Sequence, residues 1–155
     1  MNAIAPDALA ALTGTEVGVS RWQYVTQERI DAFADLTDDP QFIHVDPVRA
    51  EREGPYGTTV AHGFLTLSLL SPMARDALPE IAGARHGVNY GFDRMRFVAP
   101  VRAGKRVRGR FTLKRCERRA DGALALTWTV TIEIEGEARP AVVADWIVLR
   151  YLVEA

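Results

Sequence analysis

The sequence places a carboxylate and an imidazole in one short segment, Asp39-Pro40-Gln41-Phe42-Ile43-His44. The two side chains could hold one water between them, one removing a proton and the other delivering one, because an unperturbed histidine titrates near ~6.5 and acts either way at neutral pH. Hydration of an α,β-unsaturated thioester requires that chemistry. The alternative is that Asp39 ends a helix and His44 is a hydrogen-bonded loop histidine. The spacing alone does not separate the two interpretations.

A second candidate site lies at Ala61-His62-Gly63, just before an apolar run. If Gly63 begins a helix, its N–H lacks an intrahelical acceptor and lies at the positive end of the helix dipole. Such a donor stabilises negative charge on a thioester oxygen, and glycine admits a substrate close to the backbone. The alternative is a glycine that eases a tight junction, beside a histidine with structural hydrogen bonds.

Ser71 follows Gly63 by eight residues, a little over about two helical turns. It could face back toward Gly63 and hydrogen-bond the catalytic carboxylate. The alternative is a small helix residue that allows close packing.

Helices are expected in the first half of the chain. Thr26 is a plausible N-cap for a helix over about 27–36, and Asp46-Pro47 predicts a second helix that runs to about residue 53. Residues 63–74 are apolar nearly all round, which predicts a helix buried on most sides, kinked or divided by Pro72. The apolar stripe of the first helix would comprise Ile30, Phe33, Ala34 and Leu36.

Strands are expected after residue 86, where the hydrophobic period becomes two. Apolar and polar residues alternate over 106–114 and 124–135, around a turn that includes Asp121-Gly122, and 141–152 reads as a central strand. Helices followed by an antiparallel sheet predict an α+β fold. The expected form is the hotdog arrangement, a long buried central helix wrapped by a curled sheet of five or more strands. It would be one domain over 1–155, with 1–15 a loose lead-in.

The composition of the chain argues against several classes of partner, cofactor and location. The formal net charge of −1 gives no sign of a nucleic-acid or anionic-membrane partner. The lone Cys116 excludes an intrachain disulfide, and the apolar runs are shorter than the roughly 18 residues of a membrane span, so a cytoplasmic location is expected. The three histidines lack metal-ligand spacing, and no metal is expected. The basic stretch 102–119 could serve coenzyme phosphates or form a solvated polar sheet face.

Three blocks together resemble the MaoC-like dehydratase and (R)-specific enoyl-CoA hydratase family. They are the 39–46 segment, Ala61-His62-Gly63-Phe64-Leu65, and the segment 89–101. The resemblance implies that Asp39 and His44 are the catalytic pair. It also implies that the Gly63 amide is the oxyanion donor, that Ser71 supports Asp39, and that substrate contacts come from Gln41, Phe42, His62, Arg94 and Arg96.

The first block departs from the commoner family motif, which has Gly before the aspartate and Asn-Pro two and three residues after it. Here those places hold Asp38 and Gln41-Phe42. The Gln-aromatic-Ile-His version is similar to the nodulation-protein-N-like branch. Asp38 beside Asp39 leaves two candidate carboxylates, of which Asp39 has the family spacing to His44.

The resemblance implies an (R)-specific enoyl-CoA hydratase, or 3-hydroxyacyl-CoA dehydratase in the reverse direction, which needs no metal or redox cofactor. The substrate would be an acyl-CoA or an acyl carrier protein thioester, and the chain is expected to form a homodimer or a higher homo-oligomer. Two alternatives are a hotdog acyl-CoA thioesterase and a non-catalytic acyl-CoA-binding hotdog protein.

Overall fold

The computed structural model describes residues 3–153, in which helices and strands follow the predicted order of helices first and a sheet afterwards. In chain order the elements are α1 (Pro6–Ala10), β1 (Glu16–Val19), β2 (Gln23–Tyr24), α2 (Gln27–Thr37), α3 (Phe42–Val45), α4 (Pro47–Glu53), α5 (Gly63–Ser68), α6 (Leu70–Ala77), β3 (Ala84–Phe97), β4 (Arg106–Arg118), β5 (Leu124–Ile134) and β6 (Val142–Leu152).

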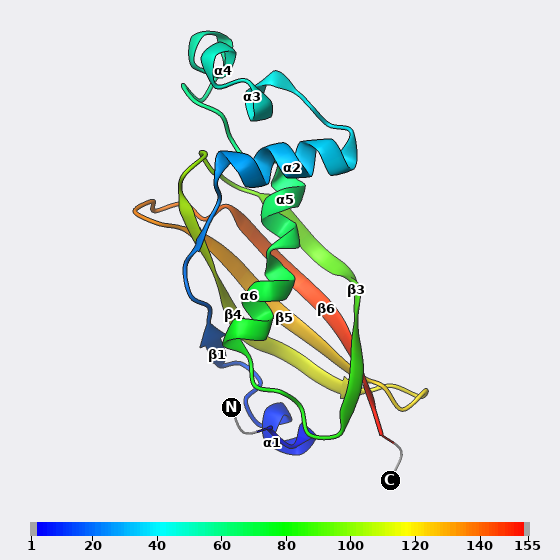
Figure 1. The fold of residues 1–155 in the computed structure, drawn as a ribbon. Coiled ribbons are helices and arrows are strands. Elements are labelled where there is room, and N and C mark those ends of the chain that lie inside the picture. The colour runs from blue at the N-terminus through cyan, green and yellow to red at the C-terminus, as the bar shows by residue number, and fades with distance from the viewer. Residues whose placement is uncertain (1–2, 154–155) are drawn as a thin grey trace.

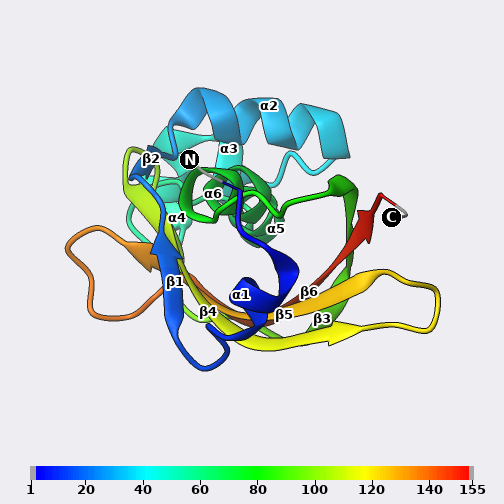
Figure 2. The same ribbon diagram turned by 90° about the horizontal axis from the view of Figure 1, so that it is seen from below.

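The strands form one antiparallel sheet in the order β1-β4-β5-β6-β3, with β2 also paired to β4. The sheet curls into a trough that holds α5 and α6, and α2 lies across these helices on the side away from the sheet (Figures 1 and 2). β6 lies inside the sheet as expected, while β3 forms one end of it. The predicted α+β arrangement is confirmed, with six strands.

Local capping fixes the starts of two helices near the candidate site. The Thr26 hydroxyl accepts a hydrogen bond from the Arg29 N–H (3.4 Å) at the start of α2, and Asp46 accepts one from the Arg49 N–H (2.9 Å) at the start of α4. Each cap satisfies an amide that would otherwise lack an acceptor. The predicted stripe of α2 was wrong at Leu36, which is 84% exposed because it lies on the outer side of that helix.

The central helix is present but divided. α5 ends at Ser68, Leu69 forms a turn, and α6 begins at the next residue. Pro72 accounts for the division, because it has no N–H to donate to the Ser68 carbonyl and its ring crowds that carbonyl. The prediction of burial on most sides is confirmed, and one exposed stripe runs along the remaining face, comprising Phe64, Ser68, Pro72 and Arg75.

The core lies between this helix and the inner face of the sheet. The predicted alternation is confirmed, because every second residue is buried throughout β5 and in β4 as far as Leu113. Among the largest fully buried side chains are Leu70, Met73, Phe111, Leu126 and Ile132. Burying each such side chain stabilises the fold by about 1.5–3 kcal/mol.

Arginines on β4 pair with glutamates along the same face of the sheet. Arg108 contacts Glu133 at 2.6 Å, and Arg110 contacts Glu16 at 2.8 Å. Arg106 is also held by a glutamate, Glu135. These pairs favour the interpretation of the basic stretch as a solvated polar sheet face.

The N-terminal segment was predicted to be a loose lead-in, and this was wrong for its described residues. α1 buries Leu9 in the core, and Ile4 forms a bridge with Ile81. Apolar residues at these positions gain from burial against the end of the trough. None of the helices within residues 3–153 has the length and apolar character needed to cross a membrane.

Met73 tests how much the helix–sheet contact contributes to stability. Its side chain is 0% exposed, so Met73→Ala should lower the free energy of unfolding by about 2–5 kcal/mol through lost burial and a residual cavity. Leu36→Ala is the control and should change it by less than about 0.5 kcal/mol. Urea unfolding followed by circular dichroism measures both. Equal effects would contradict this account of the core.

Candidate active site

The sharp turn after α2 brings the predicted pair together. Asp38 ends α2 in the left-handed region with φ of 53°, and the next amide, that of Asp39, donates to the Ala34 carbonyl at 3.0 Å. The chain then reverses into α3. Ligand atoms of Asp39, His44 and His62 all lie within 4.8 Å of one another. Asp39 is therefore the carboxylate of the cluster, and its side chain is 60% exposed.

His44 is held in a defined tautomer. Its Nδ1 lies 2.7 Å from the Val60 carbonyl, which can only accept, so Nδ1 carries the proton and Nε2 keeps a lone pair. Burial lowers the pKa of His44 below its usual 6.5, opposed by the hydrogen bond to Val60 and the charge of Asp39 and aided by the nearby His62. The imidazole is thus neutral at pH 7 and offers Nε2 as a base.

His62 lies behind the pair, with 3% of its surface exposed. Its ring stacks on that of His44 at 3.7 Å between centroids, and its Nε2–H donates to the Asp39 backbone carbonyl at 3.0 Å. Among the described residues, its Nδ1 is the one buried side-chain polar atom without a hydrogen-bond partner. This burial fits a residue that positions Asp39 and His44 better than one that contacts substrate.

The three side chains are also the one cluster of metal-ligating groups within residues 3–153. Their spread of up to 4.8 Å is wide for ligands of one ion, because zinc holds its ligand nitrogens and oxygens at about 2.0–2.2 Å from the metal. The cluster would have to contract to hold a metal. Its present arrangement suits a shared water.

Two polar residues that the sequence did not reveal hold α3 in place. The Gln27 side-chain amide donates to the His44 carbonyl at 2.7 Å, and the buried Thr59 hydroxyl donates to the Gln27 side-chain oxygen at 2.5 Å. Gln27 and Thr59 are 32 residues apart. No local pattern signals such a contact.

Gly63 begins α5 beside His44, on a cavity of about 330 Å³ that also includes Thr66 and Phe97. A Cβ at position 63 would meet the Phe97 ring at 3.0 Å, so glycine is what allows this close packing. The Gly63 amide precedes the first hydrogen bond of the helix, which runs from the Thr66 N–H to the His62 carbonyl. It is therefore placed as the predicted oxyanion donor would be.

Ser71 does not lie with this cluster in one chain. It lies on α6, where its hydroxyl accepts a hydrogen bond from the Asn89 amide at 3.3 Å. Eight residues along a helix place it about 12 Å from Gly63. Among the described residues, the structure gives Ser71 no hydrogen bond to Asp39, and its support of that carboxylate stays a prediction.

The other predicted substrate contacts lie outside the cavity beside His44. Gln41 is exposed at the start of α3, and Phe42 packs under the Arg49 guanidinium at 4.2 Å. Arg94 is in register with Asp145 across β3 and β6, and the exposed Arg96 donates to the Met95 carbonyl at 2.8 Å. The structure brings together Asp39, His44, His62 and Gly63, whereas the cavity lining includes none of Gln41, Phe42, Arg94 and Arg96.

Comparison with known proteins identifies the family of the chain. A family model described as "MaoC like domain" matches residues 8–133. The chain belongs to the MaoC-like dehydratase family. This confirms the resemblance drawn from the three sequence blocks.

Two relatives of this MaoC-like chain align over most of its length. It is 54% identical over 136 residues to "Nodulation protein N" of Rhizobium leguminosarum bv. viciae, covering 88% of this chain and 84% of that protein. It is 47% identical over 144 residues to "3-hydroxyacyl-thioester dehydratase Z" of Mycobacterium tuberculosis (strain ATCC 25618 / H37Rv), covering 93% of each. The solved (R)-hydratase from A. caviae superposes with a TM-score of 0.66 at 25% identity, covering 87% of this chain and 96% of that one. The hotdog fold is thereby confirmed.

The tautomer and pKa of His44 can be measured directly. In ¹⁵N-histidine NMR spectra, His44 should titrate below 6.5 because burial disfavours its charged form. Its neutral form should carry the proton on Nδ1. Since the pKa is lowered, the neutral base persists as the pH falls through 6.5 and is lost only at lower pH. A pKa above 6.5 would contradict burial as the dominant influence on His44, and a proton on Nε2 in the neutral form would contradict the hydrogen bond to Val60 as the contact that fixes the tautomer.

Proposed function

We propose that the chain is a hydro-lyase that adds water to trans-2-enoyl thioesters, giving (R)-3-hydroxyacyl thioesters, and that it also runs in the dehydration direction. The observation that carries the proposal is the neutral His44, with Nε2 free, in one cluster with the Asp39 carboxylate and beside the Gly63 amide. The names of the dehydratase and (R)-hydratase relatives support the same reaction class.

In the proposed mechanism the thioester oxygen accepts a hydrogen bond from the Gly63 N–H, which stabilises the enolate formed on attack. Asp39 and His44 hold a water beside the third carbon. As the water oxygen bonds to that carbon, His44 Nε2 removes one proton. The imidazolium, stabilised by the Asp39 carboxylate, returns this proton to the second carbon, directly or through the carboxylate. One water is consumed, and both groups end in their starting protonation states.

Asp39→Asn and His44→Ala test the pair. Each should lower turnover by roughly a hundredfold or more, the usual effect of losing an acid–base group, without loss of the fold. The assay follows the enoyl-thioester absorbance of crotonyl-CoA and of a longer enoyl-CoA, with a thiol reagent in a parallel cuvette. Asp38→Asn is the matched control and should keep wild-type turnover, since asparagine is well tolerated in the left-handed conformation at a helix end.

The outcomes separate the alternatives. Absorbance loss without free thiol, abolished in Asp39→Asn, supports a hydratase. Release of free thiol would move the chain to the thioesterases. If coenzyme A substrates give neither absorbance loss nor free thiol, acyl carrier protein thioesters are assayed next. If those thioesters are not turned over either, the result supports a non-catalytic acyl-CoA-binding protein.

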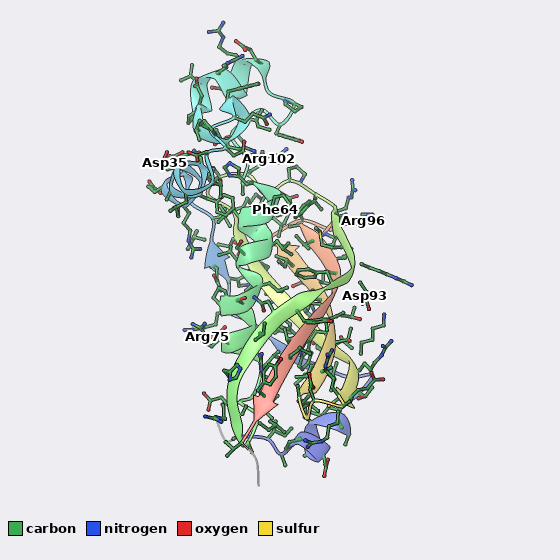
Figure 3. The ribbon with its side chains drawn as sticks, turned by 90° about the vertical axis from the view of Figure 1, so that its right-hand side faces the viewer. Asp35, Phe64, Arg75, Asp93, Arg96 and Arg102 are labelled. Carbon is green, nitrogen blue, oxygen red and sulfur yellow. The ribbon has the colours of Figure 1, made fainter. Side chains whose placement is uncertain are left out.

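The functional unit in this proposal is a homodimer. One side of the chain combines the unpaired edge of β3 with the exposed stripe of the central helix, and Phe64 there is 65% exposed (Figure 3). Other exposed apolar residues on β3 are Val88, Tyr90, Phe92 and Phe97. A free edge with apolar side chains favours pairing with another strand. Antiparallel pairing of β3 with its copy brings the Ala84 end of one strand beside the Phe97 end of the other.

Such a dimer would resolve the position of Ser71. Ser71 lies beside Asn89, near the Ala84 end of β3, whereas Gly63 lies against Phe97 at the opposite end. Across the two-fold axis, Ser71 of one subunit would approach the Asp39 cluster of the other. Each site would then take residues from both subunits.

Hybrid dimers test this arrangement. Asp39→Asn and Ser71→Ala, each impaired alone, should regain activity when the two chains are co-expressed with different tags and purified as the hybrid, because one site of the pair then has both residues intact. Support of Asp39 by Ser71 within one chain would leave both sites defective and the hybrid inactive. Sedimentation should give twice the 17.1 kDa chain mass, and a monomeric mass would contradict the dimer.

A further inference from the structure

A second and larger cavity lies at the other end of the central helix from the Asp39 cluster. It has a volume of about 840 Å³ and lies between α6, the first residues of β3 and the inner face of β5 and β6. Its size falls within the range of small-molecule sites, about 300–1,000 Å³. Leu126, Trp128 and Trp146 form an apolar lining, and Ser71 and Asn89 also line it.

Arg150 introduces a charge into this cavity. In β6 the alternate residues Val142, Ala144, Trp146 and Val148 are buried against the helices, and Arg150 continues that series. Among residues 3–153 no carboxylate pairs with its guanidinium, whose one side-chain hydrogen bond goes to the Leu149 carbonyl at 3.4 Å. Burial lowers the pKa of Arg150 from its usual value, yet an arginine stays charged. A half-buried charge without a counterion is unfavourable unless a ligand supplies one.

The neighbouring strand makes room for this guanidinium. A Cβ at position 87 would overlap Arg150 Nη1, so Gly87 is what allows the side chain to lie along β3. Gly91, on the same strand, has nothing within 4 Å of such a Cβ. The placement of Arg150 therefore depends on Gly87 and not on Gly91.

Two further arginines at the cavity reinforce the attraction for an anion. Arg75 and Arg85 line it together with Arg150, and Glu80 is the one acidic residue of the lining. The ring of His86 stacks on Tyr151 at 4.7 Å. A ligand that fits this cavity has an apolar body for the tryptophans and an anionic group for Arg150.

We infer that the acyl chain of the substrate enters this cavity and that its far end carries a carboxylate, which Arg150 binds. The inference rests on the proposed function and names its substrate class, enoyl thioesters of dicarboxylic acids. A planar guanidinium holds a carboxylate through two parallel hydrogen bonds. In the proposed dimer the Ser71 end of this cavity faces the catalytic cluster of the other subunit. A chain whose thioester lies on Gly63 of one subunit therefore runs into the cavity of the next.

Pairs of substrates of equal length test whether the intact oligomer prefers dicarboxylic over monocarboxylic enoyl thioesters. The kcat/KM for hydration is measured for trans-2-enedioyl-CoA and trans-2-enoyl-CoA esters of equal length, from six to ten carbons. At the best length, Arg150→Met should reduce the ratio of dicarboxylic to monocarboxylic substrate by about tenfold or more, the usual range for a lost charge-assisted hydrogen bond. Arg150→Lys should lose less, because it keeps the charge without the paired geometry. A ratio unchanged in Arg150→Met at every length overturns the inference.

Glycine variants separate the placement of Arg150 from general damage to the strand. Gly87→Ala should lower the same ratio by displacing the guanidinium, whereas Gly91→Ala should leave it at the wild-type value. Equal effects of the two variants would contradict the assigned position of Arg150.

Two further arms distinguish the possible failures. N-acetylcysteamine thioesters lack the coenzyme phosphates. If Arg150→Met still lowers the dicarboxylic preference with these thioesters, Arg150 binds the carboxylate of the acyl chain. If the effect is confined to coenzyme A esters, Arg150 binds a coenzyme phosphate, and the inference is overturned. Tryptophan fluorescence, which Trp128 and Trp146 report, measures binding of octanoate and octanol without any turnover. Octanoate binding that weakens in Arg150→Met while octanol binding does not supports the cavity even if no enoyl thioester is hydrated. Octanoate binding that is unchanged in Arg150→Met counts against it.

Discussion

The hydrogen bond from His44 Nδ1 to the Val60 carbonyl is the interaction on which the site depends. It fixes the tautomer, and so leaves Nε2 as the free nitrogen of a neutral imidazole. A second bond, from the Val60 N–H to the Ile43 carbonyl at 3.0 Å, ties the same two segments together. Gln27 and Thr59 then anchor the His44 backbone. The imidazole is thus held from its ring and from its main chain, which is what a base needs in order to meet one water repeatedly in the same geometry.

The curled sheet surrounds the central helix unequally. It encloses one flank of the helix and leaves the flank beside the edge strand β3 uncovered. The start of the helix places Gly63 beside His44, while its far half lines the larger cavity. One chain therefore has the proposed acid–base groups and its larger cavity at opposite ends, and a two-fold arrangement is the simplest way for one substrate to use both.

Local rules predicted much of this molecule, and contacts between distant segments account for the rest. Capping at Thr26 and Asp46, the alternation in β4 and β5, and division of the helix by Pro72 depend on near neighbours, and each is found. The bond between Gln27 and Thr59 leaves no local pattern, and neither does the burial of Leu9. The role of Ser71 stays a prediction for a related reason. Helical spacing gives its position along the axis but does not say which chain's site it faces.

The arginines of this fold differ in whether a carboxylate of the same chain compensates their charge. On β4, Arg106, Arg108 and Arg110 each have a glutamate on an adjacent strand or directly after it, so their charges are compensated within the chain and contribute little beyond solubility. Arg150 has the same side chain, but it lies in a series of buried apolar residues, and no carboxylate among residues 3–153 compensates it. A packed apolar residue at that position would be favoured if stability alone mattered. A half-buried, uncompensated cation in a cavity with two tryptophans is therefore best explained by a ligand that carries the opposite charge during function.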